Sequence, residues 1–366
     1  MAVAVGIGRF VYTPILPLMT EELGMSKATA GFIASANFLG YLVGALLAAT
    51  SFVPGSRRTW LVISLAVSAV STGAMGVASS TGAFVVLRFV GGVASAFVLV
   101  FASALVLDRL SAAGRSGLSA VHFAGVGAGI AVAAVLVSAL MWLHFDWRAL
   151  WLASGAVGLI VLAVIPGLVP DRSDSRTVTS GVPGARRGLA ALVTAYGLFG
   201  FGYVITATFL VTIVRGSADV RPLEPVVWVV VGLTAIPSVA LWTWTGRKLG
   251  TARAFALACV LEAVGVAASV LWITTPGILV SAALLGGTFM GLTALGLIQG
   301  RQLAAGDPRR TLAIMTAAFG FGQIVGPALA GVVYDASGSF VAPSLAAVGG
   351  LLVAALLVTV TSRDHS

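Results

Sequence analysis

The chain is poor in charged residues and in cysteine. Asp, Glu, Lys and Arg together make up 9% of its 366 residues, whereas a soluble domain carries about 25%. So few charges cannot cover a water-facing surface, which excludes a soluble enzyme and a nucleic-acid-binding protein. The only cysteine, Cys259, has no partner for a disulfide bond within the chain, which excludes a disulfide-stabilised secreted domain.

Catalytic and cofactor motifs are also missing. The sequence contains no G-x-x-x-x-G-K-[ST] motif, no H-E-x-x-H motif and no cluster of Cys and His residues. We therefore expect neither direct use of ATP nor a bound metal or organic cofactor. A membrane-embedded enzyme would need two or more polar catalytic groups close together at one depth, and the sequence offers no such pair. We expect a protein that is not an enzyme.

Long apolar runs make up most of the sequence. Hydrophobic residues account for 59% of the chain, and the mean hydropathy is +1.07. A helix needs about 20 apolar residues to cross a bilayer. Twelve segments qualify: 1–18, 28–50, 59–78, 83–107, 118–140, 149–169, 189–214, 226–245, 254–274, 277–298, 313–333 and 341–361. The prediction is an all-α membrane protein with twelve transmembrane helices in a lipid bilayer.

Basic residues gather on one side of these spans. Of the 21 Lys and Arg residues, 15 lie in loops on the same side as segment 170–188 and four in loops on the other side, while Arg9 and Arg88 lie within spans. Cytosolic loops of membrane proteins carry an excess of Lys and Arg. We therefore expect a multi-pass protein of the cytoplasmic membrane with both termini in the cytosol.

Segment 170–188 divides the chain near its midpoint. It reads PDRSDSRTVTSGVPGARRG, and a polar composition rich in Ser, Gly and Arg is typical of a flexible linker. We predict that it is a cytosolic linker between an N-terminal six-helix bundle, residues 1–169, and a C-terminal six-helix bundle, residues 189–366.

Short glycine motifs recur in the second half of the chain in the same order as in the first. Gly6-Ile-Gly8 returns as Gly200-Phe-Gly202 after 194 residues, Gly91-Gly92 as Gly286-Gly287 after 195, and Gly125-Val-Gly127 as Gly320-Phe-Gly322 after 195. With six spans in each half, the pattern predicts two pseudo-symmetric bundles related by a parallel repeat. Because span 7 begins near residue 189, the repeat places the start of span 1 before Met1, so we expect the first helix to be N-terminally clipped.

Six segments carry a family resemblance. They are GIGRFVYTPILPLM (6–19), LRFVGG (87–92), HFAGVGAGI (122–130), YGLFGFGYVITATFL (196–210), GGTFMGLTALGLIQGR (286–301) and FGFGQIVGPALAG (319–331). With these motifs the chain resembles the major facilitator superfamily (MFS), in particular its YbfB/YjiJ branch. The resemblance implies the MFS fold, a central cavity and transport by alternating access of the two bundles.

The resemblance also implies a cytosolic gate with basic residues after spans 2 and 8. The matching positions are Arg57, Arg58, Arg247 and Lys248. No Asp or Glu lies between positions 44 and 55, so this loop lacks the acidic residue that normally forms the charge latch. The arginine of the span 4 signature is present as Arg88, which implies a coupling or gating role. The alternative is that its side chain extends to the outer surface.

Ionisable side chains within spans are the main candidates for function. A charge at the bilayer centre costs about 2.5–3.5 kcal/mol and therefore faces protein or a water-filled cavity. Glu262 is the only acidic residue far from any loop, and we predict that it carries protons. The alternative is a structural acid that bonds to a neighbouring helix or stays protonated. His122 lies near the cytosolic end of span 5, where it is either solvated or a second proton site.

Arg9 lies roughly 15 Å from the outer end of span 1, at 1.5 Å per residue. A guanidinium suits a carboxylate or a phosphate, and we predict that Arg9 binds the substrate together with Tyr12, Tyr203 and Gln323. The alternative is a brace from Arg9 to backbone carbonyls of another helix. Tyr203 occupies the position equivalent to Arg9 in the second half, so one side of the cavity would be charged and the other not.

These observations predict a secondary transporter that moves a small organic solute with an anionic group and works as a monomer. We expect proton coupling, and family association favours efflux. An uncoupled uniporter and a non-transporting membrane sensor remain as alternatives. The longest cytosolic loop has 19 residues, which is too short for the output domain of a sensor.

Overall fold

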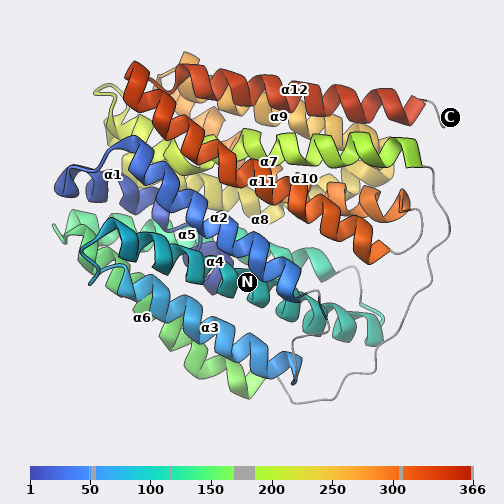
Figure 1. The fold of residues 1–366 in the computed structure, drawn as a ribbon, viewed down its shortest axis with the longest axis horizontal. Coiled ribbons are helices and arrows are strands. Elements are labelled where there is room, and N and C mark those ends of the chain that lie inside the picture. The colour runs from blue at the N-terminus through green and yellow to red at the C-terminus, as the bar shows by residue number, and fades with distance from the viewer. Residues whose placement is uncertain (49, 51–54, 116–117, 169–185, 305–307, 364–366) are drawn as a thin grey trace.

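The computed structural model describes residues 1–48, 50, 55–115, 118–168, 186–304 and 308–363. These residues form helices and turns but no strands. The helices are η1 (Ala2–Ile7), α1 (Tyr12–Leu23), α2 (Lys27–Ala48), α3 (Arg57–Ala74), α4 (Thr81–Ala112), α5 (Ser119–Trp142), α6 (Trp147–Leu168), α7 (Arg186–Arg215), η3 (Arg221–Leu223), α8 (Glu224–Leu249), α9 (Thr251–Leu271), α10 (Thr275–Gln302), α11 (Pro308–Ser337) and α12 (Val341–Arg363). Figure 1 shows that the long helices run roughly along the long axis of the molecule.

Eleven helical segments of the described residues, with η1 and α1 counted as one, are long and apolar enough to cross a membrane. The twelfth helix, α3, is less apolar because its 18 residues begin with Arg57 and Arg58 and include several Ser and Thr. It nevertheless packs along α4 and α6 as part of the same bundle. The prediction of an all-α membrane protein with twelve transmembrane helices is confirmed.

Helix contacts repeat between the two halves of the chain. Helices α2 and α3 both pack on α4, and α3 also packs on α6. In the second half, α8 and α9 both pack on α10, and α9 also packs on α12. The two halves therefore form pseudo-symmetric six-helix bundles, as the glycine motifs predict. The predicted linker lies outside the described residues, except for residues 186–188 at the start of α7.

The bundles meet along two symmetry-related pairs of helices, α2 with α11 and α5 with α8. Glycine permits this close approach. A Cβ atom at Gly31 would lie 2.1 Å from the carbonyl oxygen of Pro327, and a Cβ atom at Gly232 would lie 2.3 Å from the backbone nitrogen of Ala131. A larger residue at either position would force the two bundles apart.

Helices α1 and α7 cross on the pseudo-twofold axis. The Thr13 hydroxyl donates to the Ala207 carbonyl at 2.7 Å, and the Arg215 guanidinium donates to both carboxylate oxygens of Glu21 at 2.8 and 2.6 Å. The residues of each pair are 194 positions apart, which is the spacing of the repeated glycine motif in spans 1 and 7. Each pair thus joins equivalent positions of the two bundles, and such positions touch only at the symmetry axis.

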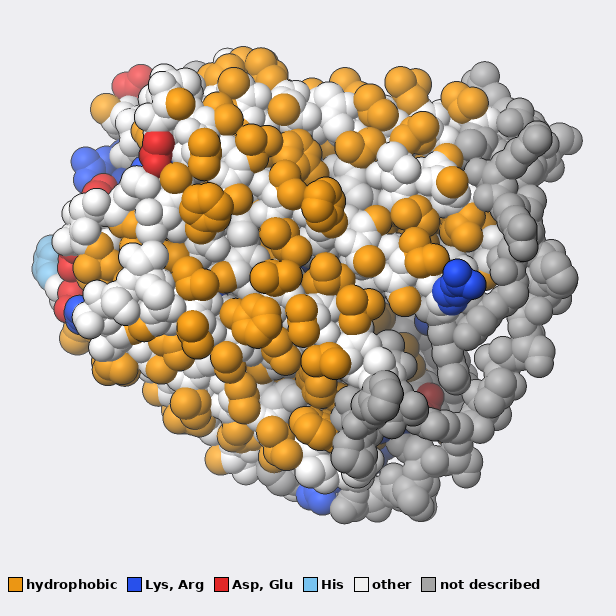
Figure 2. All heavy atoms as spheres, in the orientation of Figure 1, with side chains coloured by type: hydrophobic (Ala, Val, Ile, Leu, Met, Phe, Trp, Pro, Cys, Tyr) orange, Lys and Arg blue, Asp and Glu red, His pale blue; other side chains and the backbone are white. Residues whose placement is uncertain are grey.

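Apolar side chains cover the broad face of the molecule (Figure 2), whereas the charged side chains in view lie mainly towards the two ends of its long axis. Large apolar residues with more than half of their surface exposed include Phe32, Val121 and Leu356. A soluble monomer rarely exposes an apolar surface of this extent. The surface is that of a protein whose middle lies in the hydrocarbon core of a bilayer.

Candidate functional site

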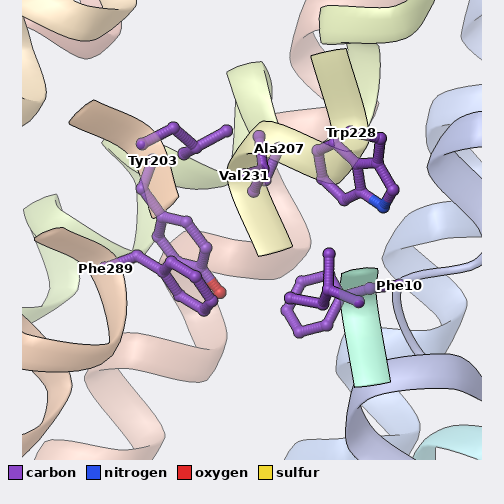
Figure 3. A pocket seen from close by; sticks show the side chains of 8 residues that line it. Phe10, Tyr203, Ala207, Trp228, Val231 and Phe289 are labelled. Atoms are coloured by element: carbon purple, nitrogen blue, oxygen red, sulfur yellow. The ribbon is translucent and has the colours of Figure 1, made fainter. Parts of the chain in front are cut away.

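A small cavity lies between the two bundles. Its volume is about 10 Å³, which is room for about one water molecule. The first bundle contributes Phe10 and Ile130, and the second contributes Tyr203, Ala207, Trp228, Val231, Leu285 and Phe289. Figure 3 shows Tyr203 and Phe289 on one side of the cavity and Trp228 and Phe10 on the other. The cavity wall is apolar, and the cavity is too small for an organic solute in this conformation.

Aromatic rings form the walls of this cavity. Phe10 of the first bundle meets Phe289 of the second edge to face, with ring centroids 5.8 Å apart. Tyr203 stacks on Phe289 at 5.7 Å and on Phe319 at 5.9 Å, with interplanar angles of 12° and 7°. Such separations are those of favourable aromatic pairs. The contact of Phe10 with Phe289 also closes the space between the bundles.

Two polar atoms belong to the aromatic residues of the cavity. The Tyr203 hydroxyl accepts a hydrogen bond from the amide of Gln323, and no described residue accepts its proton. The indole nitrogen of Trp228 forms no hydrogen bond with the described residues. Figure 3 shows this nitrogen on the edge of the indole ring nearest Phe10. Of the predicted substrate residues, Tyr203 therefore lines the cavity, with Gln323 directly behind it.

Span 1 is not the continuous helix that the sequence analysis expected. A π-helical segment, η1, precedes a short turn at residues 8–11, and α1 begins only at Tyr12. Arg88 of α4 donates to the carbonyl oxygens of Gly8 and Arg9, both at 2.9 Å. These two carbonyl oxygens lose their regular α-helical hydrogen bonds where the helix type changes, and Arg88 supplies the missing donors. The side chain is 5% exposed and does not extend to the outer surface.

Tyr12 does not reach the cavity. Its hydroxyl donates to the Ala30 carbonyl of α2 at 2.8 Å, and its ring lies 5.0 Å from the Arg88 guanidinium. The prediction of Tyr12 as a substrate residue therefore does not agree with its position, because its one hydroxyl proton is already donated within the first bundle. Tyr12 and Arg88 instead support the turn that carries Arg9.

Arg9 lies beside the cavity, on the turn between η1 and α1. Its guanidinium carbon is 4.3 Å from the ring centroid of Tyr41, 4.8 Å from that of Phe38 and 5.4 Å from that of Phe10. The side chain is 7% exposed, and its Nε and Nη2 atoms have no hydrogen-bond partner among the described residues. The brace to backbone carbonyls that was the alternative for Arg9 is made by Arg88. The Nε and Nη2 atoms of Arg9 can therefore donate to a ligand.

Glu262 lies inside the second bundle and does not line the cavity. It is 0% exposed, and its Oε2 atom contacts the hydroxyl of Thr288 on α10. The same hydroxyl lies 2.7 Å from the carbonyl oxygen of Leu284, while Oε1 of Glu262 has no partner among the described residues. The acid is therefore held between α9 and α10, behind the cavity wall.

The remaining predicted residues lie at the end of the molecule opposite Glu21. His122 is half-buried, with its Nε2 atom 3.2 Å from the Ser103 hydroxyl. Arg57 forms an ion pair with Asp108 at 2.8 Å. The acidic partner therefore comes from the end of α4 and not from the loop after span 2, where the sequence analysis looked for it. Both basic residues that end α8 are exposed; they are Arg247 and Lys248.

Sequence reasoning missed the aromatic residues Phe10, Trp228 and Phe289. The signal available for Phe10 was its position directly after Arg9 in the first repeated motif. The signal for Phe289 was its position two residues after the repeated Gly286-Gly287 motif. Trp228 carried no comparable signal, because an aromatic residue in an apolar span most often packs against another helix.

Two six-helix bundles around a cavity on a pseudo-twofold axis define the class of MFS secondary transporters. The family model described as "Uncharacterised MFS-type transporter YbfB" matches residues 1–359. The chain therefore belongs to the YbfB-like family of MFS transporters, a family of multi-pass membrane transporters and not of enzymes.

Individual relatives agree with this family. The chain is 30% identical to the MFS-type transporter YceJ of Bacillus subtilis (strain 168) over 47% of this chain and 45% of YceJ. It is 27% identical to the benzoate transport protein of Acinetobacter baylyi over 46% of this chain and 37% of that protein. The chain thus matches less than half the length of these curated relatives. The crystal structure of a mutant of the nucleoside transporter NupG has the same fold, with a TM-score of 0.71 at 14% identity over 98% of this chain and 99% of NupG.

Proposed function

We propose that the chain is a secondary transporter of small organic anions. The observation that carries this proposal is the guanidinium of Arg9, which is buried beside the cavity with two unpartnered nitrogens and forms no ion pair with a described residue. Aromatic rings stabilise the charge in part, but a buried charge without a counter-ion is still unfavourable. A carboxylate can accept two parallel hydrogen bonds from a guanidinium and neutralise it. The relative named as a benzoate transport protein supports a carboxylate as the anion.

Alternating access is supported by the contacts that join the bundles at one end. Beside the pair of Arg215 with Glu21, Asp335 of α11 accepts hydrogen bonds from the backbone nitrogens of Lys27 at 3.0 Å and Ala28 at 2.9 Å, which begin α2. These contacts must break before the cavity can open at this end. We infer that this end is extracellular and closed, and that the basic opposite end faces the cytosol together with both termini.

Proton coupling is supported by the single proton of the Thr288 hydroxyl. That hydroxyl contacts two acceptors, the carboxyl group of Glu262 and the carbonyl of Leu284, but it can donate to only one of them. If Glu262 is protonated, it donates to Thr288, and Thr288 donates to Leu284, so both hydroxyl protons have an acceptor. If Glu262 is ionised, Thr288 must turn away from Leu284, and a buried charge remains with few partners. We infer that Glu262 is neutral in this conformation and ionises in another.

The other predicted residues have supporting roles in this proposal. Arg88 positions Arg9 by holding the turn at residues 8–11. The ion pair of Arg57 with Asp108, together with Arg247 and Lys248, belongs to the cytosolic gate. His122 is a partly solvated residue at the cytosolic end of α5. Efflux is the proposed direction, on family association.

Replacing Arg9 tests the anion site. In proteoliposomes, Arg9→Gln should weaken binding of radiolabelled benzoate by about tenfold or more, since a hydrogen bond to a charged group contributes about 1.5–3 kcal/mol. The matched control is Arg148→Gln, because Arg148 donates to the carbonyls of Gly76 and Ala78 far from the cavity. Equal binding of benzoate by wild type and Arg9→Gln would contradict the assignment.

Replacing Glu262 tests the coupling. A pH gradient should drive benzoate transport by the wild type, and Glu262→Gln should abolish this drive while leaving benzoate exchange without a gradient. Glutamine is nearly isosteric with the neutral acid and keeps a hydrogen-bond donor towards Thr288, so the fold should tolerate it. If the gradient drives the variant as well as the wild type, Glu262 is not the proton carrier. If the gradient has no effect on the wild type, the protein is a uniporter.

A further inference from the structure

The unused hydrogen-bonding capacity around the cavity consists mainly of donors, with Oε1 of Gln323 behind Tyr203 as an unpartnered acceptor. Arg9 has two unpartnered nitrogens, Trp228 has an unpartnered indole N–H, and the Tyr203 hydroxyl proton is not donated to any described residue. Trp228 is 1% exposed and Tyr203 is 2% exposed, so both groups are shielded from bulk solvent in this conformation. A ligand that completes these groups must carry oxygen acceptors.

Two of these donor residues, Tyr203 and Trp228, line an aromatic pocket, and Arg9 precedes the lining residue Phe10. Phe10, Tyr203, Trp228 and Phe289 line it together, and their rings belong to both bundles. We propose that the pocket selects an aromatic acid with a single ring, and that Trp228 is the specificity-determining residue for an oxygen substituent on that ring. This inference rests on the proposed function, because Arg9 would hold the carboxylate.

A ring would enter the pocket only when the bundles move. The present cavity of about 10 Å³ is far smaller than a benzene ring, which needs on the order of 150 Å³. Phe10 and Phe289, whose centroids are 5.8 Å apart, close the space from opposite bundles. A planar ring inserted between them replaces one aromatic contact by two, because aromatic pairs form at separations of about 4.5–7 Å. An aliphatic acid has no ring and gains neither contact.

A comparison with Trp242, the other buried tryptophan of α8, shows why Trp228 is the candidate. The indole of Trp242 donates to the Gly287 carbonyl at 2.7 Å, so its N–H is used within the bundle. The indole N–H of Trp228 has no such acceptor and belongs to a residue of the cavity wall. A buried donor left without a partner is unfavourable, and a hydroxyl or ether oxygen on the ring of the ligand would satisfy it.

Binding measurements on the purified full-length protein test the inference. The probes are benzoate, 4-hydroxybenzoate and tartrate, an aliphatic acid. The wild type should bind 4-hydroxybenzoate more tightly than benzoate, and tartrate at least tenfold more weakly than either. Trp228→Phe keeps an aromatic ring but removes the N–H. It should weaken 4-hydroxybenzoate binding about three- to tenfold, the range of one hydrogen bond, and leave benzoate binding within about twofold.

Trp151→Phe is the matched control. Trp151 also has a buried indole nitrogen without a partner among the described residues, but it lies beside Tyr12 in the first bundle and does not line the cavity. This variant should bind both aromatic acids as the wild type does. The inference is overturned if Trp228→Phe weakens benzoate and 4-hydroxybenzoate equally, or if Trp151→Phe reproduces its selectivity.

The probes also separate this inference from the proposed function. If tartrate binds as tightly as the aromatic acids, and binding depends on Arg9, the anion site stands and the aromatic selection is wrong. If no carboxylate binds to the wild type, the proposed function itself fails.

Discussion

Replacing Glu21 by glutamine should shift the transporter towards the state that is open at the outer end. Glu21 and Arg215 join α1 to α7 on the pseudo-twofold axis through two hydrogen bonds of 2.8 and 2.6 Å. Arg215 also binds Glu224 at 2.8 Å, but that contact lies within the second bundle and survives opening. Of the two ion pairs of Arg215, only the one with Glu21 is lost when the bundles separate there, so Glu21 and not Glu224 biases the equilibrium.

The size of the shift follows from exposure and geometry. The side chain of Glu21 is 53% exposed and that of Arg215 is 13% exposed, so solvent screens the pair, while its two-pronged geometry favours the upper end of the range for exposed pairs. We expect about 1 kcal/mol, or about a fivefold change in the ratio of the two states. Asp335→Ala removes a cap from the start of α2, which contributes about 1 kcal/mol more. The double variant should change the ratio by about 30-fold if the effects add.

Thiol labelling from the outside measures this ratio. A cysteine introduced as Ala207→Cys lies in the cavity wall below the contact of Thr13 with Ala207. A membrane-impermeant thiol reagent should reach it only when the outer end opens. The native Cys259 is buried, so its background labelling should be low. The labelling rate should rise about fivefold with Glu21→Gln.

The neighbouring acid provides the control for charge. Glu22→Gln removes the same charge one residue along the chain, and Glu22 forms no ion pair with a described residue. Its labelling rate should equal that of the unmodified reporter. Equal rates for Glu21→Gln and Glu22→Gln would refute the reasoning, since the contact with Arg215 would then have no effect on opening.

Two further predictions concern stability and packing. Arg88→Lys should lower the free energy of unfolding by about 1–3 kcal/mol, because an ammonium cannot hold the carbonyls of Gly8 and Arg9 in the same two-pronged geometry; thermal unfolding in detergent measures this, and an unchanged melting temperature would contradict it. Gly232→Ala should destabilise the protein and impair transport, because its Cβ would lie 2.3 Å from the backbone of α5. Gly287→Ala, which has open space around the new Cβ, should be neutral or stabilising by up to about 1 kcal/mol. Similar melting temperatures for the two alanine variants would mean that close packing of α5 and α8 does not limit stability.

The fold followed closely from the sequence, with one local exception. Apolar runs of bilayer length must form helices, because lipid offers no partners to the backbone. The repeat spacing of 194 residues reappears in the contacts of Thr13 with Ala207 and of Glu21 with Arg215. The change of helix type in span 1 was not predicted, since a glycine such as Gly8 is also tolerated within an intact membrane helix.

The candidate site was predicted only in part. Arg9 and Tyr203 stand out in the sequence as polar groups within spans, and both lie at or beside the cavity. Tyr12 stands out for the same reason but faces the interior of the first bundle. Trp228 was not singled out, although it lines the cavity, because composition does not distinguish an aromatic side chain in a binding pocket from one that packs against a helix.

The sequence by itself determined that this protein crosses a membrane and consists of two related halves. Whether a segment can cross a bilayer depends on the total hydropathy of its contiguous residues, and an internal repeat is found by comparing the two halves of the sequence directly. Only the tertiary structure decided which side chains meet. A helix turns by about 100° with each residue, so successive side chains face different neighbours. In an apolar span the side chains that face lipid resemble those that face protein, so the sequence does not tell the two sides of the helix apart. Contacts such as that of Arg88 with the Gly8 carbonyl, or of Phe10 with Phe289, depend on the rotation and tilt of helices that are far apart in the chain, and packing of all twelve sets those angles together.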